Sequence, residues 1–200
     1  MALAILASGM DENTLKLGLF LRQSAITNPY LIDAFQQVPA AVFHTHLDAL
    51  KPDLRAYMID KLDIDKYDKI LEIGTSSGYQ TALMAQIARR VYTLDIQRPT
   101  YLAAQQRFQQ LSYSNITAMC GNGLHGWEAQ MPFDRIILNA ACHFIPENIV
   151  NHLKPNGVMV LPLIEPHQQQ LKRIYKNGDG YEIEDLRVSD FQGLIQGESI

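Results

Sequence analysis

The sequence predicts an α/β fold, in which a mostly parallel, twisted sheet is preceded by helices and completed by an antiparallel hairpin. Three observations support this prediction. Apolar runs alternate with helical patterns from residue 69 onward, as in sheets built from strand–helix–strand units. Most of these runs are continuously apolar, which is typical of strands buried on both faces of a parallel sheet. After Pro166, two segments of alternating character flank Asn-Gly-Asp-Gly, a strong signal for a hairpin turn.

The composition is that of one globular domain: of 200 residues, 47% are hydrophobic and 19% are charged. We expect an N-terminal helical part over residues 1–64, followed by the sheet with its helices and hairpin over 65–200. The net charge is −4 and no cluster of Lys and Arg occurs, so nucleic acid is not an expected partner. No apolar run approaches the length needed to span a bilayer, so a membrane is not expected either.

Two features indicate a cytoplasmic protein. The chain has only Cys120 and Cys142, both inside apolar runs, which predicts buried and reduced thiols. The first ten residues are apolar, but the run is short and no basic segment leads it, so an export signal is not expected.

Helical patterns fill the first sixty residues, beginning with leucines on one side of 12–23. A second helix is expected to begin at Asn28-Pro29 and to end at Val38-Pro39, and a third to begin at Pro52. The expected strands then cover 69–73, 91–95, 116–120, 135–138 and 158–163; the helices between them cover 79–88, 100–111 and 146–153; and the hairpin pairs 170–176 with 181–188.

The most informative segment is Lys-Ile-Leu-Glu-Ile-Gly-Thr-Ser-Ser-Gly-Tyr-Gln-Thr-Ala at residues 69–82. A strand ends there in a turn bounded by Gly74 and Gly78, which we call the glycine loop (residues 74–78), and a helix begins at once. No third glycine follows at the spacing of a dinucleotide fingerprint. Asp95 closes the next apolar run, where such folds bind a ribose. The pattern therefore indicates a nucleoside cofactor without a pyrophosphate, and S-adenosylmethionine is the commonest of these.

Several segments resemble one family in order along nearly the whole chain. The order of elements resembles the Rossmann-like class I methyltransferases. Residues 71–82 and 91–95 resemble the glycine loop and ribose-binding strand end of the protein-L-isoaspartate O-methyltransferases. Gly-Asn-Gly-Leu-His-Gly-Trp at 121–127 is similar to their Gly-Asp-Gly-x-x-Gly-Trp, and 133–141, 153–157 and the leading 29–39 with Phe43 match as well. Ser76 stands where the family usually has Gly, and Asn122 where it has Asp.

The resemblance implies a binding site for S-adenosylmethionine, with S-adenosylhomocysteine as the product. The helix that begins at Tyr79 would face the methionine carboxylate, Asp95 the ribose hydroxyls and Asn122 the adenine amino group. The implied cofactor-binding residues are Glu72, Gly74, Thr75, Ser76, Gly78, Tyr79, Asp95, Ile96, Asn122 and Gly123. A structural role is an equal alternative for Glu72.

The catalytic residues are left open, and the candidates near the methyl group are Asn139, His143 and His46. A loop histidine pair at His44 and His46 has no third ligand at a recognisable spacing, so no metal site is expected.

One segment of the family is missing from this chain. A Gly-Gln-Thr-Ile-Ser-x-Pro motif, whose hydroxyls lie at the methyl group and the substrate carboxylate, would precede Pro52. Here Phe43 and Pro52 are separated by only eight residues, and Leu50 falls where the serine should be.

The resemblance implies methyl esterification of isoaspartyl carboxylates in damaged proteins, which starts their repair. Because of the missing motif, two alternatives stay open. The chain could bind the cofactor without isoaspartyl activity, as a pseudoenzyme or interaction protein, or it could methylate a different substrate. The oligomeric state is not predicted.

Overall fold

The computed structural model describes residues 26, 28–43, 50–178 and 180–191. The expected helix at 12–23 and the candidate His46 lie outside these residues. No helix in the described ranges is long and apolar enough to cross a membrane.

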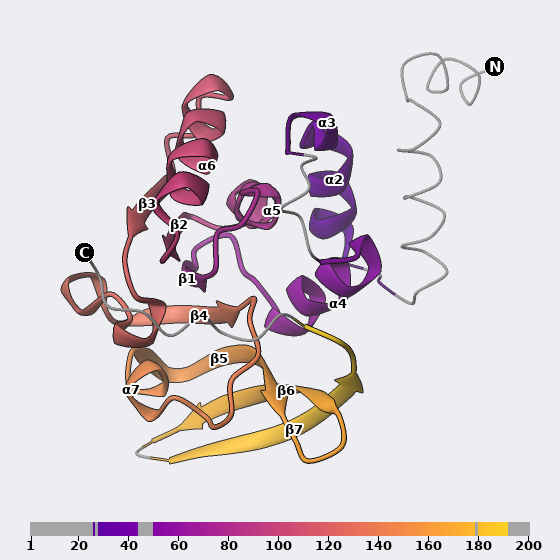
Figure 1. Cartoon of the computed structure of the whole chain (residues 1–200), viewed down its shortest axis with the longest axis vertical. Coiled ribbons are helices and arrows are strands. Elements are labelled where there is room, and N and C mark those ends of the chain that lie inside the picture. The colour runs from indigo at the N-terminus through magenta and orange to yellow at the C-terminus, as the bar shows by residue number, and fades with distance from the viewer. Residues whose placement is uncertain (1–25, 27, 44–49, 179, 192–200) are drawn as a thin grey trace.

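The core of the fold is a seven-stranded sheet with the order β3-β2-β1-β4-β5-β6-β7 (Figure 1). The pairs β1–β2, β2–β3, β1–β4 and β4–β5 are parallel, while β5–β6 and β6–β7 are antiparallel. This confirms the predicted parallel sheet with a terminal hairpin. The strands are β1 (Lys69–Ile73), β2 (Arg90–Asp95), β3 (Ile116–Cys120), β4 (Phe133–Leu138), β5 (Leu153–Ile164), β6 (Gln169–Asn177) and β7 (Gly180–Val188).

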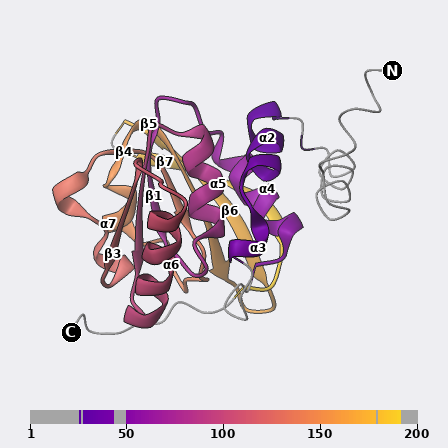
Figure 2. The ribbon, with the colours of Figure 1, turned by 90° about the horizontal axis from the view of Figure 1, so that it is seen from above.

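The central strands are buried on both faces, as their continuous hydrophobicity predicts. Successive residues along a strand contribute to opposite apolar clusters: Ile70 and Ile137 to one, and Leu71, Ile136 and Leu138 to the other. The first cluster includes residues of α2 (Pro29–Gln37), α4 (Pro52–Leu62), α5 (Tyr79–Ile87) and α6 (Arg98–Gln110), and the second those of α7 (Glu147–Val150). Helices therefore cover both faces of the sheet (Figure 2).

The helices begin where the prolines predict. Asn28 caps α2, because its Oδ1 accepts hydrogen bonds from the N–H groups of Tyr30 at 3.0 Å and Leu31 at 3.4 Å. The short α3 (Ala40–Phe43) follows, and Pro52 lies in the first turn of α4. The ring of Tyr79, the first residue of α5, contacts Phe35 of α2 and Phe43 of α3 at centroid distances of 6.2 and 5.6 Å. The N-terminal helices therefore pack directly on the helix that follows the glycine loop.

One predicted element is wrong in length. The helix expected over 146–153 is limited to Glu147–Val150, and Leu153 already belongs to β5. Leu153 pairs with Phe133 of β4, and the N–H of Phe133 donates to the carbonyl of His152 at 2.8 Å. Because this pairing adds ladder hydrogen bonds ahead of the apolar run at 158–163, the strand extends further toward the N-terminus than hydrophobicity alone indicates. The other boundaries differ by one or two residues.

Candidate functional site

The predicted site residues that the structure describes lie at the carboxyl ends of the parallel strands. In the sheet, β2 and β3 lie on one side of β1, and β4 lies on its other side. The strand order therefore reverses between β1 and β4. The N–H of Gly74 donates to Leu94 O at 2.8 Å, and the N–H of Asn139 donates to Ile73 O at 2.9 Å. Ligands of open α/β sheets bind at such a switch point, outside the carboxyl ends of the strands.

The glycine loop needs glycine for two different reasons. Gly74 and Gly78 have φ values of +97° and +87°, a conformation that residues with a Cβ rarely adopt. A Cβ atom at Gly78 would also lie 2.8 Å from the ring of Phe108 on α6. The loop is closed by the N–H of Gly78, which donates to Thr75 O at 2.9 Å. The turn ends at Gly78, and α5 begins directly after it, so the N-terminus of this helix, which favours an anionic group, adjoins the glycine loop.

Ser76 has a backbone conformation that glycine adopts with less strain. Its φ of +50° lies in the left-handed region, which costs a residue with a side chain about 1–2 kcal/mol. Its N–H donates to Asp95 Oδ2 at 2.9 Å, so the loop is tied to the end of β2. The structure thereby gives a physical reason for the glycine that the resembling family carries here.

Asp95 is held rigidly as an acceptor at the end of β2. Its side chain is buried, and its two oxygens accept from the N–H groups of Ser76 and Gln97, each at 2.9 Å. Burial raises the pKa of Asp95, and the backbone N–H groups around it offset part of that rise. A carboxylate can accept about four hydrogen bonds, so these contacts leave room for a hydroxyl of a ribose. Ile96, which follows it, is half-buried.

Asn122 and Gly123 are brought against the end of β1 by a close packing contact. A Cβ atom at Gly123 would lie only 2.1 Å from Cγ2 of Ile73, so a side chain at this position would displace the loop. Asn122 Oδ1 accepts from the N–H of Leu124 at 3.0 Å and caps the short helix η2 (Gly123–His125). The segment that the resemblance assigns to the adenine therefore lies beside the glycine loop.

Glu72 is fully buried just before the glycine loop. Its Oε2 accepts hydrogen bonds from Thr81 Oγ1 at 2.5 Å and Thr93 Oγ1 at 2.8 Å, and its Oε1 accepts from Asn139 Nδ2 at 2.9 Å. Burial raises the pKa of Glu72 to about 7, although the three donors and the charge of Arg55 act in the opposite direction. Glu72 is therefore part of a buried hydrogen-bond network next to the glycine loop.

Asn139, a candidate near the methyl group, links this network to the glycine loop. Its Nδ2 also donates to Gly74 O at 2.8 Å, and its Oδ1 accepts from Gln80 Nε2 at 2.6 Å. Asn139 thus uses its whole amide group to hold β1, the glycine loop and α5 in fixed relation. Because its polar atoms already have partners within the protein, Asn139 positions other residues of the site.

His143, the other described candidate, is exposed on the segment that follows β4 at the same edge. This segment is anchored to the end of β5, because the N–H of Cys142 donates to Pro162 O at 3.0 Å and Cys142 O accepts from Ile164 at 2.8 Å. His143 and the neighbouring Phe144, which is 63% exposed, are therefore presented on a fixed backbone.

The sequence did not reveal the buried polar residues whose hydrogen bonds hold Glu72, Asn139 and the glycine loop in place. Thr81, Thr93 and Gln80 are buried, and Thr75 Oγ1 lies 2.7 Å from Thr93 Oγ1. A threonine inside a continuously apolar strand is the signal that could have identified Thr93. Arg55 is buried on α4, with its guanidinium 5.0 Å from the centroid of the Tyr79 ring. A cationic residue among the apolar residues of α4 is the sequence feature that could have identified Arg55.

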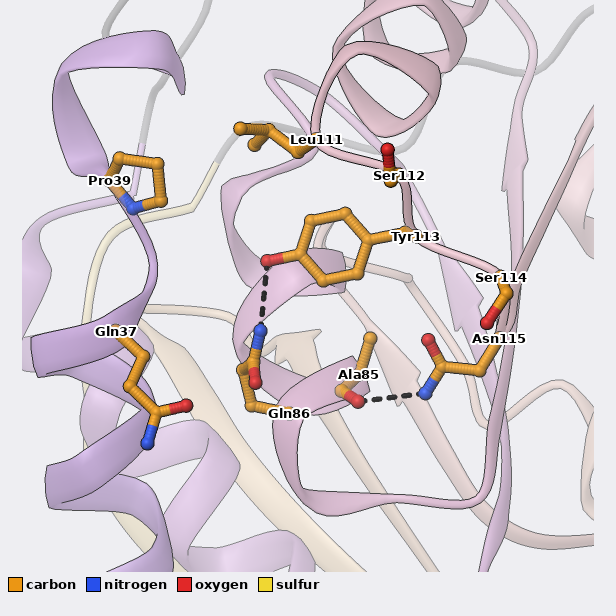
Figure 3. A pocket seen from close by; sticks show the side chains of 9 residues that line it. All are labelled: Gln37, Pro39, Ala85, Gln86, Leu111, Ser112, Tyr113, Ser114 and Asn115. Carbon is orange, nitrogen blue, oxygen red and sulfur yellow. Dashed lines mark hydrogen bonds between the residues drawn. The ribbon is translucent and has the colours of Figure 1, made fainter.

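A separate cavity lies at the opposite edge of the sheet. It has a volume of about 550 Å³ and is lined by Gln37, Pro39, Ala85, Gln86, Leu111, Ser112, Tyr113, Ser114 and Asn115 (Figure 3). Gln86 Nε2 donates to Tyr113 Oη at 3.2 Å, and Asn115 Nδ2 donates to Ala85 O at 2.8 Å. Its lining carries no charged side chain, and burial raises the pKa of Tyr113 above its ordinary value. The cavity therefore offers no acid or base at neutral pH, and the carboxyl edge is the better candidate for a reaction.

No group of three or more metal-binding side chains occurs among the residues that the structure describes. The site consists of backbone N–H groups, neutral polar side chains and buried carboxylates.

The open sheet, its short glycine loop and the carboxylate at the end of β2 are those of the class I methyltransferases. The chain belongs to the protein-L-isoaspartate(D-aspartate) O-methyltransferase family, whose profile matches residues 18–197.

Individual relatives agree with this assignment. The chain is 35% identical to a protein-L-isoaspartate O-methyltransferase of Ruegeria sp., over 95% of this chain and 97% of the relative. It is 33% identical to one of Parvibaculum lavamentivorans, over 94% and 93%, and 38% identical to protein-L-isoaspartate O-methyltransferase 2 of Polaromonas sp., over 86% and 82%.

Solved structures show the same fold. A protein-L-isoaspartate O-methyltransferase superposes with a TM-score of 0.83 at 20% identity, covering 93% of this chain and 67% of the other. A Plasmodium falciparum homologue, solved in complex with S-adenosyl-L-homocysteine, superposes with a TM-score of 0.79 at 18% identity and covers 94% and 100%. The described elements therefore have the architecture of this family.

Proposed function

We propose that this chain binds S-adenosylmethionine at the carboxyl edge of β1, β2 and β4 and transfers its methyl group to the carboxylate of isoaspartyl residues in proteins. The observation that carries this proposal is the convergence of the glycine loop, Asp95 and the Asn122–Gly123 segment at one switch point of the sheet. Membership of the methyltransferase family supports it.

The residues at this edge fit the parts of such a cofactor. The backbone N–H groups at the start of α5 suit the methionine carboxylate, and Asp95 suits the ribose hydroxyls. Gly123 packs directly on Ile73, which leaves no space for a side chain there, so we expect the nucleoside to lie against the backbone at this position. Asn122 presents an amide in place of a carboxylate, and an amide oxygen also accepts from an amino group.

The reaction requires positioning more than acid–base catalysis. The substrate carboxylate is ionised at neutral pH, so no base is needed to activate it. The cofactor supplies the methyl group and leaves as a neutral thioether. What the protein contributes is the alignment of oxygen, methyl carbon and sulfur, for which orientation carries most of the effect. Asn139 holds the glycine loop through its hydrogen bond to Gly74 O, and we expect the exposed segment with His143 and Phe144 to receive the substrate.

The short connection between Phe43 and Pro52 favours a second candidate function. Eight residues separate them where the family carries its hydroxyl-bearing motif, so the substrate carboxylate would lack that contact. A cofactor-binding protein with a different methyl acceptor, or with no transfer activity, is the resulting alternative.

Two measurements separate these functions. Calorimetric titration with S-adenosylhomocysteine tests the cofactor site, and an assay with an isoaspartyl peptide and its aspartyl counterpart tests the substrate. We expect binding, and transfer to the isoaspartyl peptide only. Binding without transfer would favour the alternative, and no binding at all would contradict both.

A further inference from the structure

The carboxylate of Glu72 lies directly behind the glycine loop, on which the proposed cofactor site is built. Asn139 connects the two, because its Nδ2 donates to both Gly74 O at 2.8 Å and Glu72 Oε1 at 2.9 Å. A Cβ atom at Gly74 would lie 3.2 Å from that of Asn139, so the two segments are in close contact. A single amide group thus links the carboxylate of Glu72 to the carbonyl of Gly74, the first residue of the glycine loop.

Three neutral donors and one positive charge act on Glu72 from different elements. Thr81 of α5, Thr93 of β2 and Asn139 after β4 donate hydrogen bonds, and Arg55 of α4 adds a positive charge. Asp95, at the end of β2, is the neighbouring carboxyl group on this edge. Burial outweighs the donors and Arg55, and raises the pKa of Glu72 to about 7. The ionised and protonated forms of Glu72 are therefore close in free energy at neutral pH, and a nearby charge can shift the balance between them.

We propose that Glu72 distinguishes the methyl donor from the transfer product by their charge, releasing a proton when the donor binds and taking one up when the product forms. The proposal rests on the function proposed above. S-adenosylmethionine carries a positive sulfonium, whereas the sulfur of S-adenosylhomocysteine is neutral. During transfer, a substrate carboxylate oxygen bonds to the methyl carbon, the carbon–sulfur bond breaks and its electron pair stays on sulfur. The proton that Glu72 then binds comes from water.

The direction of the effect follows from the sign of the charge. A positive group above Gly74 favours the ionised form of Glu72 and lowers its pKa. The affinity for the donor therefore increases with pH through the range in which Glu72 ionises. The affinity for the product depends much less on pH in this range, because its sulfur is neutral. One unit of pKa difference corresponds to a tenfold change in relative affinity. We expect the ratio of donor to product affinity to increase about tenfold or more between about pH 5.5 and 8.

Calorimetry can count the protons. Titrations with S-adenosylmethionine and with S-adenosylhomocysteine, each at about pH 6.5 in two buffers of different ionisation enthalpy, yield the protons released on binding. We expect more protons released with the donor than with the product. In the variant Glu72→Gln, which keeps an acceptor oxygen and nearly the same shape, this difference should vanish. Asp95→Asn, which removes a carboxylate on the ribose side of the same edge, should bind both ligands more weakly and retain the difference.

The outcomes separate this proposal from the function on which it rests. Equal proton release for two ligands that both bind, or a difference that persists in Glu72→Gln, would overturn the role of Glu72 alone. Failure of both ligands to bind would overturn the cofactor assignment and this role with it. If Glu72→Gln does not fold, carbon-13 NMR of the Glu72 carboxyl in the wild-type protein provides the second measurement. Its titration midpoint should be lower in the donor complex than in the product complex, and equal midpoints would overturn the proposal.

Discussion

Substitution of Gly78 by alanine tests how the glycine loop is built. The new Cβ would lie 2.8 Å from Cε1 and Cζ of Phe108 and 3.4 Å from Cβ of Ala104, so it would overlap the aromatic ring. The φ of +87° adds backbone strain of about 1–2 kcal/mol, and overpacking against the ring adds about 1–3 kcal/mol. We expect the free energy of unfolding to fall by about 2–5 kcal/mol, which corresponds to about 4–20 °C in Tm for a domain of this size.

Gly178 provides a matched control for this substitution. It also has a positive φ, of +61°, but a Cβ there meets nothing within 4 Å. Gly178→Ala should therefore show the backbone strain alone, about 1–2 kcal/mol. Thermal unfolding followed by circular dichroism measures both variants, and the double variant Gly78→Ala/Phe108→Leu should recover part of the loss by relieving the overlap. Equal losses for Gly78→Ala and Gly178→Ala would refute the packing of α6 against the loop.

Three further substitutions test the site. Asp95→Ala should weaken S-adenosylhomocysteine binding about 10- to 100-fold in calorimetry, because charge-assisted hydrogen bonds to the ribose contribute about 1.5–3 kcal/mol; an unchanged affinity would show that the ribose lies elsewhere. Ser76→Gly should raise the free energy of unfolding by about 0.5–1 kcal/mol in urea titrations, since relief of left-handed strain exceeds the extra entropy of the unfolded chain; a destabilised variant would contradict the strain at Ser76. The folded-state pKa of Glu72 is raised from 4.5 to about 7, so its contribution to stability is fully present below pH 4.5 and is lost as the pH rises to about 7. Relative to Glu72→Gln, the wild type should therefore lose about 3 kcal/mol over that range, and parallel pH profiles would argue against a raised pKa.

Hydrophobic pattern and turn residues were sufficient to predict most of the fold. Strand positions followed from continuous apolar runs, and the helix starts at Pro29 and Pro52 followed from the fixed φ of proline. The error at residues 146–153 arose because Leu153 joins β5 by pairing with Phe133. A strand pairing between residues twenty positions apart leaves no trace in local periodicity.

The candidate site was partly predictable from local sequence patterns. Glycines and the acidic Asp95 stand at recognisable spacings, so their place at the carboxyl edge could be inferred. The buried partners of Glu72 could not, because Thr81, Thr93 and Asn139 come from three different elements that meet only in the folded sheet. Roles for Asn139 and His143 at the methyl group stay predictions, as does the loss of the hydroxyl-bearing motif.

The sequence by itself determined the α/β class, the glycine loop and the family, because these depend on local conformational preference and on the order of short motifs. Only the tertiary structure decided that Asn139 links the loop to Glu72, that Ile73 requires glycine at position 123, and that burial raises the pKa of Glu72 to about 7. Each of these depends on distances between segments far apart in the chain. Such distances, and the low dielectric of a packed interior, exist only once the sheet has assembled.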